Sequence, residues 1–487
     1  MRLVFWAEWL RFCRSRANLC ILLAYCITLA LCALWSAHGA HQLRAANAQE
    51  AATRVALIQQ ARDSQDSVQV RAQASGRVSS PVSGQASANA NATTDPKRAA
   101  MQAFSLGRSM AGQAQLPPGP GLALSLSPHH TLTTRIAVSV ESRHADGRRS
   151  DTLNNPMLAQ YRALDLAAVV ALLMPLVAIG WCAGTVQEDR ERGIWRTICA
   201  QAVRPCQPLH AALAIRAAVL WLPAALACGL AMADSAGTAT GSGVLWWTLC
   251  LAAYAGFWVA LCGALARLPI SSAAALLTGL SAWLLLTFAV PAGLEAMAAA
   301  RHPMPSRLAS IVELRQAQQD AEVRMPELIN AWYAAHPESA PRISNGHTWP
   351  VTFLPRFAYQ DDLVRPLMRR FDQQRLAQAA FLERWAWLSP PMALLQVSDY
   401  LAGISAAHHT AFLDAVDQYE QAWRNFFVPR VMSYRGLTAD DYAHIPRFQG
   451  VAPASAAPVP SLLGMLLLVT AALMALLLGF RRRIGRD

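Results

Sequence analysis

DLAAVVALLMPLVAIGWCAGTVQEDRERGIWR, residues 165–196, places a long apolar run directly before a dense run of charges. Residues 164–183 contain one charged side chain, Asp165, whereas residues 188–196 contain six. At a rise of ~1.5 Å per residue, an apolar helix of this length crosses a hydrocarbon core of ~30 Å. The stretch therefore predicts a membrane span that ends at a charged surface.

The composition of the whole chain favours the same class of protein. Of 487 residues, 54% are hydrophobic and only 15% are charged, whereas soluble domains carry about 25% charged residues. We predict an all-α polytopic membrane protein with six transmembrane helices and two extracytoplasmic insertions, the second mostly helical. The predicted spans are residues 19–37, 164–186, 211–233, 244–266, 270–291 and 461–480.

Arginines cluster on alternate connections between the predicted spans, and the short outside loop 234–243 contains no Lys or Arg. By the positive-inside rule, we expect a multi-pass membrane protein with both termini in the cytoplasm. All ten cysteines lie in predicted spans or inside connections, so the outside segments need no disulfide. Residues 1–18 are expected to form a cytoplasmic interfacial helix, and residues 38–163 a first extracytoplasmic segment. Residues 187–210 are expected to form a cytoplasmic coupling segment, residues 292–460 an extracytoplasmic helical domain, and residues 481–487 a cytoplasmic tail.

The first insertion is low in sequence complexity. Residues 40–66 are rich in Ala and Gln and predict a helix, whereas Ser, Ala, Gly and Gln dominate residues 73–94. LPPGPG at 116–121 interrupts regular structure, and the β-branched residues of 131–142 predict a strand. We therefore expect the middle of this insertion to be loosely ordered.

The second insertion carries helical periodicity in residues 306–336, 361–388 and 408–427. The predicted apolar face of the middle helix consists of Leu363, Leu367, Phe371, Leu376, Ala380 and Trp385. The tryptophans suit either a core or a surface for an amphipathic cargo, and we favour the core, because large aromatic residues dominate core energetics. These tryptophans are Trp332, Trp349, Trp385, Trp387 and Trp423.

The chain carries no recognisable motif for catalysis or ATP hydrolysis. A Walker A loop needs a lysine after glycine, and the only lysine, Lys97, lies in DPKRA. The spans hold no buried acidic pair for a proton cycle, and we expect Arg216 to reach the headgroups. Paired histidines without cysteine or acidic partners favour structural roles over a metal site. We therefore predict a non-catalytic membrane subunit with no cofactor or metal of its own and no nucleic-acid partner.

Two short segments next to the spans are the candidate functional sites. QEDRER and the following IWRTICAQAVR predict an amphipathic helix, which is either a docking element or a charged stop-transfer flank. The N-terminal MRLVFWAEWLRFCRSRA mixes aromatic residues with arginines, which suits either an interfacial helix or a basic flank. The candidate docking residues are Glu188, Asp189, Arg190, Glu191, Arg192, Gly193, Ile194, Trp195 and Arg196. The candidate interfacial residues are Glu8, Trp9, Arg11, Arg14 and Arg16.

Several motifs resemble those of a known family. DLAAVVALLMPLVAIG at 165–180, followed by DRERG at 189–193, is similar to the second span and coupling segment of type-2 ABC exporter permeases. EWLRFCRSR at 8–16 is similar to their interfacial start. Five motifs between residues 388 and 448 resemble a subfamily of these permeases that has a large uncharacterised extracytoplasmic domain between spans five and six. These motifs are LSPPMALLQ, YLAG, HHTAF, YEQAWRNFF and DDYAHIPRF. The resemblance covers nearly the whole chain.

The resemblance implies a permease subunit that moves an unidentified substrate, such as a lipid, a peptide or another amphipathic molecule, out of the cytoplasm or inner membrane. Two such subunits, in a homodimer or with a paired homologue, would surround the path, and separate cytoplasmic ABC ATPase subunits would bind ATP and Mg²⁺. Residues 188–204 would contact the ATPase, so we expect reversal of Asp189 and Glu191 to Lys to uncouple the two proteins. Two alternatives stay open: a signalling or mechanotransmission protein whose insertions sense or act on an envelope partner, and a membrane-bound enzyme.

Overall fold

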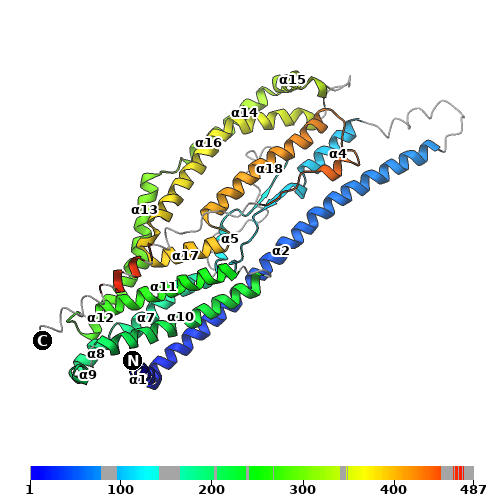
Figure 1. The fold of residues 1–487 in the computed structure, drawn as a ribbon. Coiled ribbons are helices and arrows are strands. Elements are labelled where there is room, and N and C mark those ends of the chain that lie inside the picture. The colour runs from blue at the N-terminus through cyan, green and yellow to red at the C-terminus, as the bar shows by residue number, and fades with distance from the viewer. Residues whose placement is uncertain are drawn as a thin grey trace, which may run out of the picture.

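The computed structural model describes residues 2–77, 96–141, 165–201, 206–236, 241–266, 268–340, 347, 349–450 and part of 464–475. These residues are mostly helical and include one two-stranded antiparallel sheet. Figure 1 shows an elongated molecule with a bundle of helices at one end and a second group of helices, the insertion domain, at the other. The long helix α2 (Arg16–Arg77) runs along both parts.

The chain is a helical membrane protein. Within the described residues, five helical segments are long and apolar enough to cross a membrane: Arg16–Ser64, Leu166–Glu191, Pro208–Ala233, Gly243–Leu265 and Ser272–Arg301. The first segment belongs to α2, and the second consists of α7 (Leu166–Cys182) and α8 (Thr185–Glu191). The third and fourth are α10 (Cys206–Ala236) and α11 (Gly241–Leu265). The fifth begins with α12 (Ser272–Leu284) and continues through the π-helical turn η3 (Leu285–Ala289) into α13 (Val290–Arg301). The predicted sixth span, residues 461–480, lies mostly outside the described residues.

Two helices extend beyond the predicted ends of their spans. Helix α2 continues without a break from the predicted span 19–37 through the predicted helix 40–66. The helix predicted to end at residue 291 continues to Arg301. Alanine-rich sequence follows both spans and has high helix propensity, so the helix does not end where the apolar run ends.

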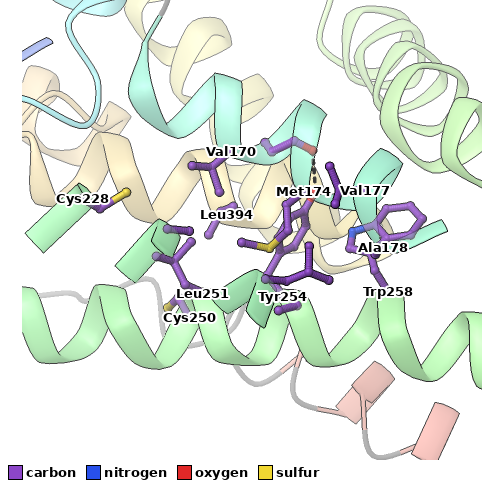
Figure 2. Close-up of a cluster of buried hydrophobic side chains, with 14 of the residues drawn as sticks. Val170, Met174, Val177, Ala178, Cys228, Cys250, Leu251, Tyr254, Trp258 and Leu394 are labelled. Carbon is purple, nitrogen blue, oxygen red and sulfur yellow. Dashed lines mark hydrogen bonds between the residues drawn. The ribbon is translucent and has the colours of Figure 1, made fainter. Parts of the chain in front are cut away.

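Helix α7 occupies the centre of the bundle. It contacts α2, α10, α11, α12 and the insertion-domain helix α17 (Pro390–Leu401), and most of its side chains are buried. Figure 2 shows Val170, Met174 and Ala178 of α7 among side chains from α10, α11 and α17. Small residues on α7 allow these helices to approach closely, which is how helices associate in lipid.

A proline in α7 is compensated by a hydroxyl group from α11. Pro175 has no N–H to donate to the carbonyl of Ala171, four residues earlier. The Tyr254 hydroxyl donates to that carbonyl at 2.6 Å, as the dashed line in Figure 2 shows. Because lipid offers no hydrogen-bond donor, this bond satisfies a group that would otherwise be buried without a partner.

A second proline produces the same situation in the last described span. In the π-helical turn, the Val290 N–H bonds to the carbonyl of Leu285, five residues earlier. Pro291 has no N–H to continue this pattern to Leu286, and the Ser389 hydroxyl donates to the Leu286 carbonyl at 2.6 Å. Since Ser389 is also the N-cap of α17, the bond ties the insertion domain to this span.

The insertion domain builds one hydrophobic core from both predicted insertions. Helix α4 (Pro96–Arg108) packs against α18 (Ala406–Met432), and the Trp423 indole N–H donates to the Gly107 carbonyl at 2.9 Å. The other elements are β1 (Gln113–Gln115), α5 (Ser127–Thr131), β2 (Arg135–Ala137), α14 (Arg307–Val323), α15 (Met325–Ala335), α16 (Trp349–Trp385) and α17. The described part of the first insertion is therefore ordered by the second, whereas the low-complexity stretch 73–94 falls mostly outside the described residues.

Several predicted boundaries in the insertions differ from the structure. The predicted strand 131–142 is reduced to β2, in which Ile136 lies opposite Ala114. The predicted helix 306–336 is interrupted between α14 and α15, and the helix predicted from residue 361 begins at Trp349. Tertiary contacts decide these ends, because propensity alone marks them poorly.

The predicted apolar face of α16 is wrong along much of the helix. Leu367 is buried, but Leu363, Leu376 and Trp385 are exposed. Helix α16 contacts α13, α14, α15 and α18 at different points along its length, so no single face is buried throughout. The preference for core tryptophans is correct for Trp423, which is fully buried, whereas Trp349 is exposed and Trp332 and Trp387 are half-buried.

We predict that Tyr254→Phe lowers the free energy of unfolding by about 1–2 kcal/mol, because it leaves the Ala171 carbonyl without a donor. Denaturant unfolding in detergent micelles, followed by circular dichroism, measures this change. The matched control is Tyr25→Phe, since the Tyr25 hydroxyl donates at 3.2 Å to Leu220, a carbonyl that no proline deprives of its helical bond. An equal loss in both variants would contradict the role assigned to Tyr254.

Candidate functional site

The predicted coupling segment forms a helical elbow at the end of the bundle. Helix α8 is followed by α9 (Ile194–Gln201), and Gly193 between them has a φ of +73°. A residue with a side chain adopts this left-handed conformation only with strain, so glycine suits the bend. The elbow thus changes the direction of the chain directly after the central span (Figure 1).

Asp189 of α8 is buried and bonds to the N-terminal helix. Only 4% of Asp189 is exposed, and Arg11 of α1 (Arg2–Arg14) donates to its two carboxylate oxygens at 3.0 and 2.5 Å. The hydrogen bond to Asp189 raises the pKa of Arg11 above its usual range. Such a bidentate pair fixes geometry as well as contributing energy, so it holds α1 against α8.

The rest of α8 is bonded to two further helices. Glu191 accepts hydrogen bonds from the Ser272 N–H at 2.8 Å and the Ser272 hydroxyl at 2.9 Å, at the start of α12. A carboxylate is favourable at a helix N-terminus. The Gln187 amide donates to the Leu265 carbonyl at the end of α11, at 2.9 Å. Helix α8 is therefore held by α1, α11 and α12.

The remaining elbow residues face outward. The Ile194 side chain is 45% exposed although it is apolar, and Arg190 and Arg196 are exposed as well. The Arg190 guanidinium lies 5.7 Å from the centroid of the Trp195 ring, which is partly buried against the bundle. Glu188 and Arg192 form an exposed ion pair at 2.7 Å, a type of pair that contributes little to stability.

The N-terminal helix α1, which carries most of the predicted interfacial residues, also has both buried and exposed side chains. Phe12, which follows Arg11, is buried and packs edge-on against Trp181 of α7 at 5.1 Å. Trp6, Trp9 and Arg14 of α1 are exposed, and so is Arg16 at the start of α2. A helix that packs on protein through Phe12 and exposes tryptophans and arginines is typical of the membrane interface.

Arg216 occupies a different place from the one predicted. Its side chain does not extend outward but is buried, with Glu8 of α1 and Cys182 of α7 among the groups that interact with it. Burial raises the pKa of Glu8, and the charges of Arg11 and Arg216 oppose that rise. Arg216 therefore lies between α1, α7 and α10, where its charge stabilises the ionised form of Glu8.

Gln187 and Ser272, which help to hold the elbow, are not among the candidate residues predicted from the sequence. Ser271 and Ser272 precede an apolar run, and Ser271 caps α12 by accepting a hydrogen bond from Ala274. A serine pair before an apolar run is a recognisable helix start. That signal predicts where α12 begins, but it does not predict that Glu191 binds there.

Within the described residues, no group of three or more His, Cys, Asp or Glu side chains is arranged to hold a metal ion. The cysteines described are free thiols.

Part of the chain is similar to a known protein family. Residues 307–450 match the model of a domain of unknown function, DUF3526. This region begins with α14 and includes α16, α17 and α18, and hence most of the insertion domain. No curated protein and no solved structure matches the chain.

We predict unequal effects from the two sides of the ion pair. The Arg11 side chain is 46% exposed and that of Asp189 is 6% exposed. Arg11→Ala leaves a buried carboxylate without its partner and is expected to cost about 2–3 kcal/mol, whereas Asp189→Ala leaves an arginine that water can reach and is expected to cost about 1 kcal/mol.

Unfolding in detergent measures both variants and the double variant Arg11→Ala/Asp189→Ala. The double variant should recover most of the stability lost in Arg11→Ala, because it removes the stranded charge. Additive losses would show that the pair is not coupled.

Proposed function

We propose that this chain is the membrane-spanning permease subunit of an ATP-binding cassette exporter. It is a non-catalytic subunit, and ATP and Mg²⁺ bind to separate cytoplasmic ABC ATPase subunits. Two permease subunits, identical or paired homologues, sit in the bacterial inner membrane with both termini in the cytoplasm. The proposed cargo is a lipid, a peptide or another amphipathic molecule.

The observation that carries this proposal is the division of the elbow residues into anchors that bond to other helices and an exposed face. Gln187, Asp189 and Glu191 fix α8 against three other helices. Ile194 and Arg196 remain exposed on the adjoining helix. An exposed apolar anchor with charged neighbours on a rigid support is what a protein-docking surface requires. This favours docking over the stop-transfer alternative for residues 188–196.

The anchors also provide a physical route for coupling. An ATPase can shift the permease between two states only if it contacts those states differently. A displacement of α8 would act on α1 through Asp189, on α12 through Glu191 and on α7 through the chain itself. The elbow would therefore move the ends of several spans together.

The insertion domain supports the mechanotransmission alternative as a second candidate. Its core joins both insertions, and α17 packs directly on α7 and α11. In this version, ATP hydrolysis would drive a movement of the insertion domain on an envelope partner instead of passage of a cargo through the bundle. Movement of a labelled lipid or peptide in vesicles, driven by ATP, would favour export.

Substitutions on the exposed face test the proposal more directly than reversal of Asp189 and Glu191. Both carboxylates have partners inside the chain, so their reversal would also disturb the bundle. We predict that Ile194→Asp and Arg196→Glu each reduce co-purification with the partner ABC ATPase at least tenfold, since truncation of an interface anchor costs about 2 kcal/mol or more.

The matched control is Val323→Asp, which places the same charge at an apolar residue of the insertion domain that is 81% exposed. This variant should co-purify with the ATPase as the wild type does. Undiminished recovery of the ATPase with the elbow variants would overturn the proposed docking surface.

A further inference from the structure

Residues 119–127, the junction segment, lie where the bundle meets the insertion domain. Leu122, Ala123 and Leu124 in its middle have no exposed surface and belong to the same core as α7. At one end, the Gly119 carbonyl accepts a hydrogen bond from Arg44 of α2 at 3.1 Å. The segment is thus enclosed by structure although no regular helix or strand covers most of it.

Backbone contacts join the junction segment to the end of α17. The Gly119 N–H donates to the Ala402 carbonyl and the Gly121 N–H to the Leu401 carbonyl, both at 2.8 Å. A Cβ atom on Gly119 would lie 2.5 Å from the Leu401 oxygen, and one on Gly121 would lie 2.7 Å from the Leu401 Cβ. Only glycine allows these two backbones to approach so closely.

A second set of bonds joins the junction segment to the start of α7. One carboxylate oxygen of Asp165 accepts hydrogen bonds from the N–H groups of Leu126 and Ser127, at 2.8 and 2.9 Å. The Ala167 N–H, in the first turn of α7, donates to the Leu124 carbonyl at 3.1 Å. The same short segment is therefore bonded to both α7 and α17.

Helix α17 completes the connection by packing on the bundle. Leu394 lies in the buried cluster around α7 in Figure 2, and Ser389 bonds to the Leu286 carbonyl in the π-helical turn. Beyond α17, Gly403 takes a left-handed conformation with a φ of +77°, and α18 begins three residues later. A continuous series of bonds thus runs from α7 to the core of the insertion domain.

We propose that the junction segment and α17 form a transmission element that makes α7 and the insertion domain move as one body. Since α7 leads directly into α8, a displacement at the elbow would reach the insertion domain at the opposite end of the molecule. That an ATPase causes the displacement rests on the proposed function, but the linkage itself does not. The element would deliver ATP-driven movement to whatever the insertion domain contacts.

Hydrogen exchange of the full chain in lipid nanodiscs, read by mass spectrometry, tests the linkage without any ATPase. Residues that move and open as one body exchange with a common dependence on denaturant. In the wild type, the start of α7, the junction segment, α17 and the start of α18 should share that dependence. Independent exchange of α7 and α17 in the wild type would overturn the proposal.

Gly121→Ala should separate the two parts, because its methyl group clashes with Leu401. We expect α17 and α18 to open about tenfold more often relative to α7. The matched control is Gly293→Ala, where no atom lies within 4 Å of the added Cβ. If Gly121→Ala does not fold, Ser125→Ala removes one bond of the junction and should give an increase of about fivefold. Exchange ratios equal to those of Gly293→Ala in both variants would contradict the linkage.

The junction segment also bonds to a carboxyl group of α17 whose pKa is raised. The Ser125 hydroxyl donates to Asp399 of α17 at 2.5 Å. Burial raises the pKa of Asp399 to about 6, the hydrogen bond from Ser125 opposes the rise, and the charge of Asp165 adds to it. Asp165 at the start of α7 acts on Asp399 from across the junction segment, and burial raises the pKa of Asp165 as well. Another titratable side chain beside the end of α17 is His129, whose ring bonds to the Ala402 carbonyl at 3.4 Å.

We predict that the junction is tighter in acid than at neutral pH. An ordinary Asp has a pKa of about 4, so the folded state binds this proton more tightly than the unfolded state does. The stabilisation that results from protonation of Asp399 is fully present below about pH 4 and is lost as the pH rises through about 6. Opening of the junction, corrected for intrinsic exchange, should increase by up to about 100-fold over that range. Asp399→Asn keeps an acceptor for Ser125 and should remove most of the dependence, with the remainder belonging to Asp165. An unchanged pH profile in this variant would contradict the role of Asp399.

Discussion

The structure depends on one constraint, which is that every backbone carbonyl inside a membrane needs a donor from the protein. Pro175, Pro223 and Pro291 each remove a donor from a span, and at two of them a side chain from another element replaces it. These side chains are Tyr254 for Ala171 and Ser389 for Leu286. The first bond fixes α11 against the central helix α7. The second fixes the start of α17 against a π-helical turn. At these two prolines, the carbonyl that lacks its helical bond is therefore the site of a contact that fixes how the helices pack.

The two ends of α7 show the same principle with charged groups. At one end, Asp189 binds Arg11 of α1, and Glu191 binds the start of α12. At the other end, Asp165 binds the junction segment. Each carboxylate accepts two hydrogen bonds from a different part of the chain. Such bonds orient the partner strictly, so a displacement of α7 cannot leave its neighbours unaffected.

Much of the organisation follows from local sequence. Apolar length predicts the spans in the described residues, and the charges at 188–196 mark the elbow. The sequence treats these charges alike, yet the structure separates them: Asp189 is buried and Arg196 is exposed. Spacing along a helix cannot show this, because the partner Arg11 is 178 residues away. The predicted face of α16 is wrong for a similar reason, since several helices contact it from different sides.

By itself, the sequence determines that this is a helical membrane protein, because hydrocarbon thickness sets the length of apolar residues that a span requires. It also determines where helices can bend, through Gly193 and the prolines. Only the tertiary structure decides that the two insertions share one core and that LPPGPG, expected as a break, packs against the end of α17. The physical reason is distance along the chain: a glycine marks where a backbone can approach closely, but which backbone approaches is decided by the fold.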